Sequence, residues 1–188
     1  YAPVKEGVGF HFASYDQNIF TPVIRERIRT TKAANDSHYT VYLPAYDDKK
    51  LVKLFLKLAG TQWQIFSKHI TKPYHIGRIS VFPVDNEAFT TSMASSQGVL
   101  CGAGFETPAE ALYLRKKLLV VPMKNQHEQH FNAASLKQLG VQAIKKVSKK
   151  NLARIEDWIK TEERVEVNYK ETARPAIERA LKLYEGLK

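Results

Sequence analysis

The sequence predicts a doubly wound α/β fold, in which a parallel sheet carries helices on both faces. Short apolar runs alternate along the chain with segments whose apolar residues recur every three to four positions, the pattern of βαβ units. Leu118-Leu119-Val120-Val121 is continuously apolar, as a strand buried on both faces should be. With 188 residues, 44% of them hydrophobic, the chain is long enough to bury such a sheet.

The first strand and helix of this pattern lie between residues 39 and 60. Residues 39–43 are β-branched and aromatic, which favours a strand, and the run stops at Pro44. Apolar residues then recur at helical spacing with lysines on the other face; they are Leu51, Leu54, Phe55 and Leu58. Gly60 ends this predicted helix.

The same alternation continues along the rest of the sequence. Further strands are predicted at residues 63–66, 79–84, 99–101 and 118–121. Helices are predicted around Phe89 and Met93, over 107–116 and 131–139, around Leu152, Ile155 and Ile159, and from Ala173 to Tyr184. We expect this last helix to pack back across the domain. Residues 1–37 do not fit the alternation, although Thr21-Pro22 resembles a helix start leading through Ile24 and Ile28, and we interpret them as a linker or packing segment.

The composition excludes several classes of protein. The longest apolar run, at residues 118–123, is far shorter than the roughly 20 residues of a membrane span. The single cysteine, Cys101, forms no intrachain disulfide and no structural zinc site on its own, and it is interpreted as a core residue. His127 and His130 have a spacing compatible with metal but no third ligand nearby, so we interpret them as surface histidines. These features predict a reduced, cytoplasmic protein.

The chain is strongly basic, with 29 Lys and Arg against 19 Asp and Glu and a net charge of +10. Such a balance favours anionic partners: nucleic acid, an anionic membrane surface or phosphate-bearing small molecules. The basic residues form short clusters in different segments, at residues 25–29, 49–50, 115–117 and 145–150. A nucleic-acid module concentrates such charge on one element and interleaves aromatics. We therefore interpret the clusters as solvated helix faces and expect no specific nucleic-acid partner.

The most informative sequence comes directly after the predicted strand at 99–101. Ligands of doubly wound sheets bind beyond the carboxyl ends of the strands, near the point where strand order reverses. Residues 101–112 read CGAGFETPAEAL, where two glycines let the backbone approach a ligand and the next helix offers free N–H groups to a phosphate. The same residues also form a capping box that needs no ligand, with Thr107 as N-cap, Pro108 at the first helical position and Glu110 three residues after the cap.

A longer pattern favours the ligand. Residues 102–133 read GAGFETPAEALYLRKKLLVVPMKNQHEQHFNA: a glycine turn, a Thr, a Glu-Ala pair, a strand ending in Pro, an acidic residue before Gln, and Asn-Ala three residues later. This pattern resembles the donor-binding segment of nucleotide-sugar glycosyltransferases with the GT-B fold, among them plant-type UDP-glycosyltransferases and the peptidoglycan-precursor N-acetylglucosaminyltransferases. The stretches at 20–25 and 104–112 are most similar to bacterial and archaeal glycosyltransferase-like proteins of unassigned substrate. Elsewhere, from Tyr39 onward, the resemblance is architectural.

The resemblance implies a Rossmann-like donor-binding domain at residues 38–188, preceded by a linker or packing segment at 1–37 from the interdomain region. It also implies a role for each matching residue. The donor diphosphate would be bound by Gly102, Ala103, Gly104, Phe105, Glu106 and Thr107; the ribose by Glu110; the transferred sugar by Glu128 and Gln129; and the base by Phe82 and Val84. Asn132 is expected to cap or anchor its helix.

The implied chemistry is hexosyl transfer from a nucleotide-sugar, a UDP-sugar in most relatives of this kind, without a metal or other cofactor. The acceptor would be held by a separate N-terminal domain, so we expect the 188 residues alone to bind donor and to transfer no sugar. The basic charge also suits peripheral binding at the inner face of a membrane. Two departures leave a non-catalytic glycosyltransferase-like domain as an alternative: Gly102 replaces the cation of related families, and residues 44–47 lack a Gly/Ser-rich phosphate turn. The net charge of +10 leaves a basic nucleic-acid-binding module as a further alternative.

Overall fold

A computed structural model describes residues 6–186 of the chain. Seven strands form one sheet in the order β5-β6-β4-β3-β7-β8-β9, and every neighbouring pair is parallel except β5 and β6. The strands are β3 (His38–Tyr42), β4 (Gln62–Ser67), β5 (Tyr74–Ile76), β6 (Ile79–Pro83), β7 (Gly98–Gly102), β8 (Lys117–Val121) and β9 (Gln142–Ala143). From β3 the chain first builds β4 and β6 on one side and then returns to place β7 on the other, so strand order reverses between β3 and β7.

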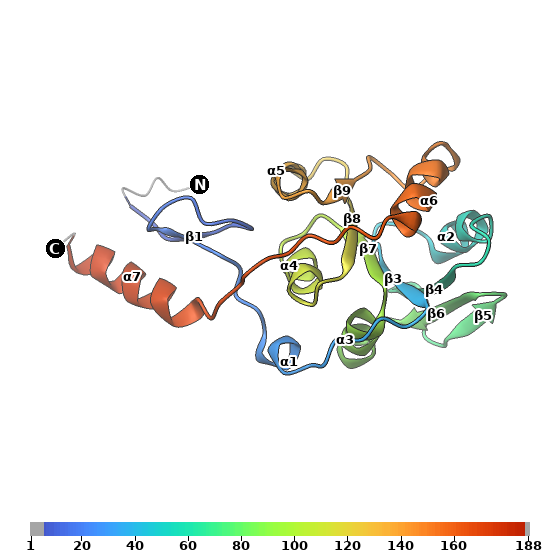
Figure 1. The fold of residues 1–188 in the computed structure, drawn as a ribbon, viewed down its shortest axis with the longest axis horizontal. Coiled ribbons are helices and arrows are strands. Elements are labelled where there is room, and N and C mark those ends of the chain that lie inside the picture. The colour runs from blue at the N-terminus through green and yellow to red at the C-terminus, as the bar shows by residue number, and fades with distance from the viewer. Residues whose placement is uncertain (1–5, 187–188) are drawn as a thin grey trace.

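Helices cover both faces of this sheet, which confirms the predicted doubly wound class (Figure 1). One face carries α2 (Asp48–Phe55) and α6 (Leu152–Lys160), which comes after a short 3-10 turn, Lys149–Asn151. The other face carries α1 (Glu26–Arg29), α3 (Asn86–Ser95), α4 (Glu106–Tyr113) and α5 (His127–Gln138). Each predicted helix and strand from residue 38 onward has a counterpart in the structure.

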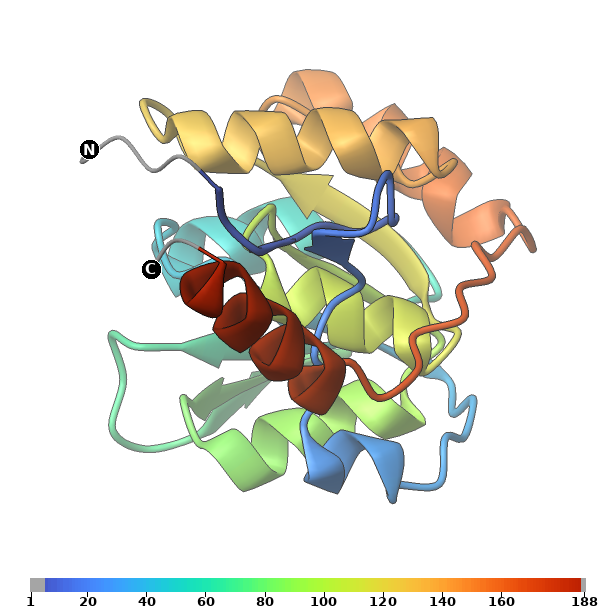
Figure 2. The same ribbon diagram turned by 90° about the vertical axis from the view of Figure 1, so that its left-hand side faces the viewer.

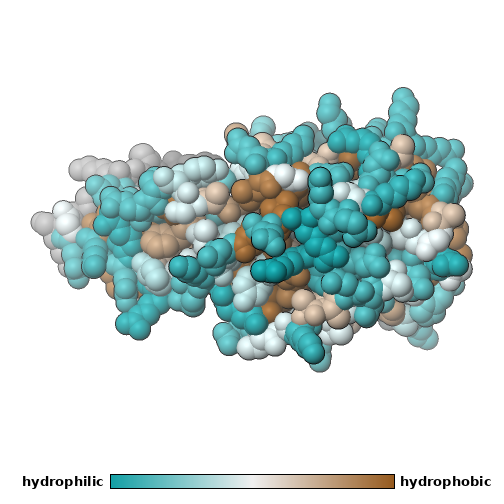
Figure 3. All heavy atoms as spheres, in the orientation of Figure 1, coloured by the Kyte–Doolittle hydropathy of each residue, from teal (hydrophilic) through white to brown (hydrophobic). Residues whose placement is uncertain are grey.

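The core lies in two layers, one on each face of the sheet. Strand β8 shows why residues 118–121 are continuously apolar: Leu118 and Val120 belong to the core beneath α4 and α5, while Leu119 and Val121 belong to the core beneath α2 and α6. Burying each such side chain contributes roughly 1.5–3 kcal/mol. Figure 3 shows hydrophobic residues gathered near the middle of one face, over α4, with hydrophilic surface around them.

Two strands of the sheet have no counterpart in the sequence-based prediction. Strand β5 forms an antiparallel hairpin with β6 through a turn at Gly77, whose φ of +57° favours glycine. Strand β9 is two residues long, too short for any periodic pattern to reveal. Both lie at the edges of the sheet, where short strands leave few unpaired backbone groups.

The segment before β3 packs against the α4 face instead of forming the helix indicated at Thr21. It contains the parallel pair β1 (Gly9–Phe10) and β2 (Ile19–Phe20), and helix begins only at α1. Ile24 and Ile28 are nevertheless buried in the core beneath α4, as their apolar spacing suggests.

The last helix, α7 (Ala173–Glu185), does not pack back across the sheet, so that expectation is wrong. It lies beside the β1–β2 segment, away from the sheet (Figures 1 and 2). Thr172 Oγ1 donates to the Thr21 carbonyl at 3.0 Å, and Arg179 Nε donates to Asn18 Oδ1 at 2.7 Å. The extended chain before α7 explains the position of this helix. Tyr169 in that chain is buried in the core on the α4 side, and the chain after it leads toward the N-terminal segment.

Candidate functional site

A cavity opens where strand order reverses, at the carboxyl ends of β3 and β7. Its volume is about 180 Å³, and it is lined by Tyr42, Pro44, Cys101, Gly102, Gly104, Phe105, Glu106, Thr107, Met123 and Gln129. The structure thus brings together the glycine loop after β7 and Gln129 of α5, as the sequence pattern predicts. We call this cavity the loop cavity. Ligands of doubly wound sheets bind at such a reversal point.

The two glycines of the loop have no structural need to be glycine. A Cβ atom on Gly104 would meet no atom within 4 Å, and one on Gly102 would lie 3.6 Å from Gln129 Oε1, an ordinary contact. Neither residue has a positive φ. Gly98 at the start of β7 is different, because a Cβ there would lie 3.0 Å from Lys117 and Trp158. Close approach of a ligand to the backbone is a use for glycine at 102 and 104 that packing does not supply.

The amino end of α4 faces this cavity with free N–H groups. The helix begins at Glu106 and has no side-chain cap. Among residues 6–186, the backbone N–H groups of Gly104 to Thr107 have no hydrogen-bond acceptor. The predicted capping box is therefore wrong: Thr107 lies inside the first turn, and Glu110 does not reach back to it. Uncapped N–H groups and the helix dipole together favour an anion.

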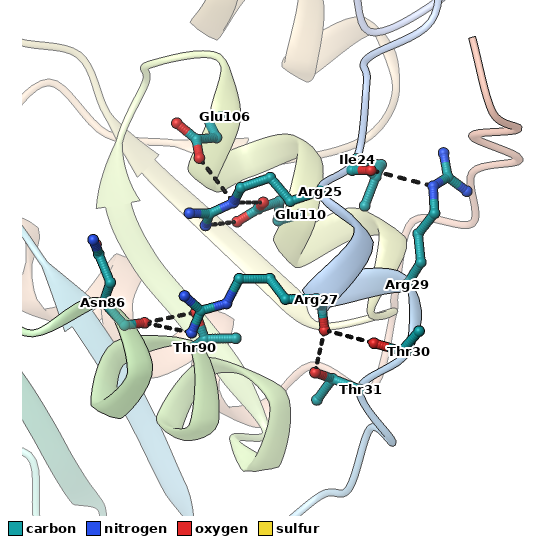
Figure 4. Close-up of polar contacts among 10 residues, drawn as sticks. All are labelled: Ile24, Arg25, Arg27, Arg29, Thr30, Thr31, Asn86, Thr90, Glu106 and Glu110. Atoms are coloured by element: carbon teal, nitrogen blue, oxygen red, sulfur yellow. Dashed lines mark hydrogen bonds and ion pairs between the residues drawn. The ribbon is translucent and has the colours of Figure 1, made fainter. Parts of the chain in front are cut away.

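Glu110 is buried and bound to an arginine from the N-terminal segment (Figure 4). Arg25 Nε donates to Glu110 Oε1 at 2.6 Å, and Nη2 donates to Oε2 at 2.8 Å. The same Nε lies 3.0 Å from Glu106 Oε1. The Glu110 hydrogen bond raises the pKa of the Arg25 guanidinium, and burial opposes it. Both oxygens of the carboxylate assigned to ribose are thus occupied, and the Glu110 side chain is only 2% exposed.

The α5 residues of the predicted sugar site divide into one that faces the cavity and one that does not. Gln129 lines the loop cavity; its Oε1 accepts the Met123 N–H at 2.9 Å, and its Nε2 donates to Gln126. Glu128 is exposed on the same helix and does not line the loop cavity. Asn132 donates to the Ala103 carbonyl at 3.1 Å, so it anchors the glycine loop to α5.

The predicted base site lies at a separate cavity of about 460 Å³ between β4, β6 and α3. Phe82 lines this cavity with Phe66, while Val84 is 43% exposed and lies outside it. The linings of this cavity and of the loop cavity have no residue in common. Cys101, by contrast, is fully buried, and burial strongly raises the pKa of its thiol, which suits the core role predicted for it.

Three cations beside the glycine loop escaped the sequence-based prediction. Lys124, Lys145 and Lys146 line a cavity of about 310 Å³ that has Pro44, Gly102 and Met123 in common with the loop cavity. Lys124 comes after β8 and the two other lysines come after β9, so all three stand at the carboxyl edge of the sheet. The lysine run at 145–150 is visible in the sequence, but only strand β9 places it next to Gly102.

Neither a metal-binding cluster of side chains nor a helix that could span a membrane is present in the described part of the chain. Residues 6–186 contain no group of three His, Cys, Asp or Glu side chains placed to bind a metal ion. Over the same residues, no helix is both long enough and apolar enough to cross a membrane.

The seven-stranded sheet, with its loop at the reversal point and helices on both faces, matches the Rossmann-like half of a GT-B glycosyltransferase fold. The family model described as "Glycosyl transferase family 1" matches residues 10–162. The chain belongs to this glycosyltransferase family. No curated protein sequence matches it.

Two solved structures show the same fold at low sequence identity. The glycotransferase of kitacinnamycin superposes with a TM-score of 0.53 and 15% identity, covering 89% of this chain and 44% of that protein. UGT89C1 of Arabidopsis thaliana, solved with UDP-L-rhamnose, superposes with a TM-score of 0.52 and 14% identity, covering 89% of this chain and 46% of that protein. The chain therefore spans less than half the length of either structure.

Proposed function

We propose that residues 38–188 form the nucleotide-sugar donor-binding domain of a glycosyltransferase that transfers a hexosyl group. The observation that carries the proposal is the loop at residues 102–107: it lies at the strand-order reversal, has glycines that packing does not require, and offers unpaired N–H groups to an anion. Family membership supports it. The UDP-L-rhamnose bound in one structure of the same fold supports a UDP-sugar as the donor.

In this proposal the loop residues Gly102, Ala103, Gly104, Phe105, Glu106 and Thr107 bind the donor diphosphate. Gln129, which reaches the same cavity, binds the transferred sugar together with Glu128. Phe82 and Val84 contact the base, and Glu110 accepts from the ribose hydroxyls once Arg25 releases it. The acceptor hydroxyl displaces the diphosphate in line at the anomeric carbon. Backbone N–H groups and the α4 dipole stabilise the charge that develops on the leaving diphosphate.

The isolated chain binds donor but transfers no sugar at enzyme rates. Donor binding alone stabilises the ground state, and rate enhancement needs groups that interact more strongly in the transition state. A base within about 3 Å of the acceptor hydroxyl is one such group, and we assign it to a separate acceptor domain. Release of nucleotide from UDP-sugars, measured with and without sugar acceptors, tests this. Acceptor-dependent turnover of roughly 1 per second or more would show that the chain is catalytically complete.

Titration calorimetry with UDP, GDP, dTDP and uridine tests the donor site. We expect UDP to bind and uridine to bind at least tenfold more weakly, because uridine lacks the diphosphate. Gly104→Leu is the test variant: a Cβ atom at this position would meet no atom within 4 Å, so we expect the variant to fold, and we expect the added side chain to obstruct the approach of the diphosphate to the loop. Unchanged UDP affinity in this variant, or no binding of any nucleotide by the folded wild type at millimolar concentration, would contradict the proposal.

A second candidate is a glycosyltransferase-like domain that does not bind donor. The bidentate Arg25–Glu110 pair favours it, because both carboxylate oxygens are already occupied. The same titration separates the two candidates, and Arg25→Met sharpens the result. If UDP binds neither the wild type nor Arg25→Met, and circular dichroism shows that the variant is folded, the non-binding candidate holds.

A further inference from the structure

The basic charge of the chain is concentrated in one part of the fold. Residues 122–154 contain seven Lys and Arg side chains and one acidic side chain, Glu128, so they carry +6 of the net charge of +10. This segment runs from the end of β8 through α5 and β9 into α6. Four of its cations come from four different pieces of it and surround one hollow.

That hollow, which we call the basic cavity, has a volume of about 580 Å³. Its cationic lining is Lys124 after β8, Lys137 of α5, Lys145 after β9 and Arg154 of α6, joined by His130. Its apolar lining is Pro122, Ala133, Ala134, Ala143 and Ile144. Neither this lining nor that of the cavity beside Gly102 includes an acidic residue. The volume is within the range of small-molecule sites.

The cations of the basic cavity are not neutralised by the protein. Among residues 6–186, none of Lys124, Lys137, Lys145 and Arg154 forms an ion pair, whereas Arg25 is paired with two carboxylates. Arg154 Nη2 donates only to the Ala143 carbonyl, at 3.2 Å, and this bond fixes its position. Several unpaired cations in one concave site favour a multiply charged anion such as a phosphate group.

The backbone that carries two of the lysines is held in place. The Val147 N–H donates to the hydroxyl of Tyr46 at 3.1 Å, and Asn151 Nδ2 donates to the Lys146 carbonyl at 2.8 Å. The loop after β9 is therefore tied to the loop after β3 on one side and to the start of α6 on the other. Such ties set the positions of Lys145 and Lys146 before any ligand binds, which lowers the entropy lost on binding.

The basic cavity lies near the donor site, with the cavity beside Gly102 between them. It has Pro122, Lys124 and Lys145 in common with the cavity beside Gly102, and that cavity adjoins the loop cavity. The basic cavity itself contains none of the residues assigned to the donor. A molecule bound there would thus lie beside the donor rather than in its place, which is the position of a second substrate.

We propose that the basic cavity binds a phosphate group carried by the acceptor substrate, whose reacting hydroxyl is held by the separate acceptor domain. The proposal rests on the proposed function, since it takes the loop cavity as the donor site. The apolar lining contacts the uncharged part of the acceptor, and the cations bind its phosphate. Phosphate on a soluble acceptor and phosphate on a lipid-linked acceptor present the same chemistry to these residues.

Amide chemical shifts of the ¹⁵N-labelled chain, monitored during titration, test the proposal. The probes are glucose 6-phosphate, with glucose as the uncharged control, and vesicles of equal parts phosphatidylcholine and phosphatidylglycerol. UDP is titrated separately, so that failure of the donor site is seen independently at residues 102–107. The variant Lys124→Gln/Lys145→Gln removes two cavity cations. Lys149→Gln/Lys150→Gln is its matched control, with the same charge change in lysines that do not line the cavity.

We expect glucose 6-phosphate, but not glucose, to shift amides around Lys124, Lys137, Lys145 and Arg154. The affinity should fall about tenfold or more in Lys124→Gln/Lys145→Gln and less than twofold in the control. If the vesicles bind as well as glucose 6-phosphate, and vesicle binding also falls in Lys124→Gln/Lys145→Gln but not in the control, the result indicates a lipid-linked acceptor and also supports the proposal. Equal losses in both variants, shifts spread over all surface lysines, or binding to vesicles but not to glucose 6-phosphate would overturn it.

Discussion

Replacing Arg25 is expected to destabilise the fold far more than replacing Arg27, two residues along the same segment. Arg25→Met leaves the Glu110 carboxylate, 2% exposed, without either of its two charged donors. Breaking a buried pair by removing one partner costs about 3–5 kcal/mol. Because the Arg25 side chain is 39% exposed, water can reach the space that it leaves, and we place the loss at the lower end, about 3 kcal/mol. For a domain of this size that corresponds to a fall in Tm of roughly 6–12 °C.

The matched control is Arg27→Met, two residues along the same segment. Arg27 is exposed and donates only to the Asn86 carbonyl, at 3.0 Å, so its replacement should cost less than about 1 kcal/mol. The double variant Arg25→Met/Glu110→Met removes both charges and leaves no buried ion. We expect it to be more stable than Arg25→Met alone, because apolar replacement of a whole pair is close to neutral.

Urea unfolding of the wild type, Arg25→Met, Glu110→Met, the double variant and the Arg27→Met control gives these free energies directly. A loss in Arg25→Met no larger than that in Arg27→Met would refute the reasoning, since it would mean that Glu110 does not depend on the guanidinium. A double variant as unstable as the two single changes added together would also refute it, because an ion pair predicts a favourable coupling between them.

Three further predictions concern other parts of the molecule. Lys116 donates to the Ala34 and Ser96 carbonyls, and burial lowers the pKa of its ammonium to about 8. A lysine whose pKa is lowered in the folded state binds fewer protons when folded, so the free energy of unfolding rises between pH 8 and about 10.5. In urea unfolding, the wild type should gain about 2 kcal/mol relative to Lys116→Met from pH 7.5 to 9.5. A difference between the two proteins that stays constant with pH would contradict this. Asn132→Ala should weaken UDP binding severalfold by releasing the glycine loop, with calorimetry as the measurement and an unchanged affinity as the contrary result. Gln129→Ala should weaken UDP-glucose binding more than UDP binding, whereas Gln138→Ala, at the far end of α5, should change neither; equal losses for both ligands in Gln129→Ala would argue against sugar recognition.

The sheet could be predicted from the sequence because its signals are local. Residues 118–121 of strand β8 are all apolar because they are buried on both faces of the sheet, and α2 and α6 each bury one apolar side. Strand β9 gave no such signal, because two residues cannot show a period. The position of α7 also has no local cause: contacts with residues 18 and 21, more than 150 positions earlier, decide it.

The loop of the candidate site could be predicted from the sequence, but the arginine that binds Glu110 could not. The glycines, the helix start nearby and Gln129 belong to a pattern within thirty residues, and the structure brings them together. The predicted capping box does not form because two hydrogen-bond donors compete for the Glu110 carboxylate. A carboxylate gains more from a guanidinium than from one neutral backbone N–H, and Arg25 is 85 positions away in the sequence, where no local rule could find it.

If Glu110 binds the ribose as we propose, the Arg25–Glu110 pair makes donor binding and the placement of the N-terminal segment interdependent. A ribose can bind Glu110 only by displacing two hydrogen bonds or by sharing oxygens that are almost inaccessible to solvent. The free energy of the Arg25–Glu110 interaction is therefore subtracted from the free energy of donor binding. By thermodynamic reciprocity, a bound donor weakens the binding of the N-terminal segment to the domain by the same amount. Because that segment also carries β1, β2 and the contacts of α7, the occupancy of the ribose site would be felt at the far end of the chain.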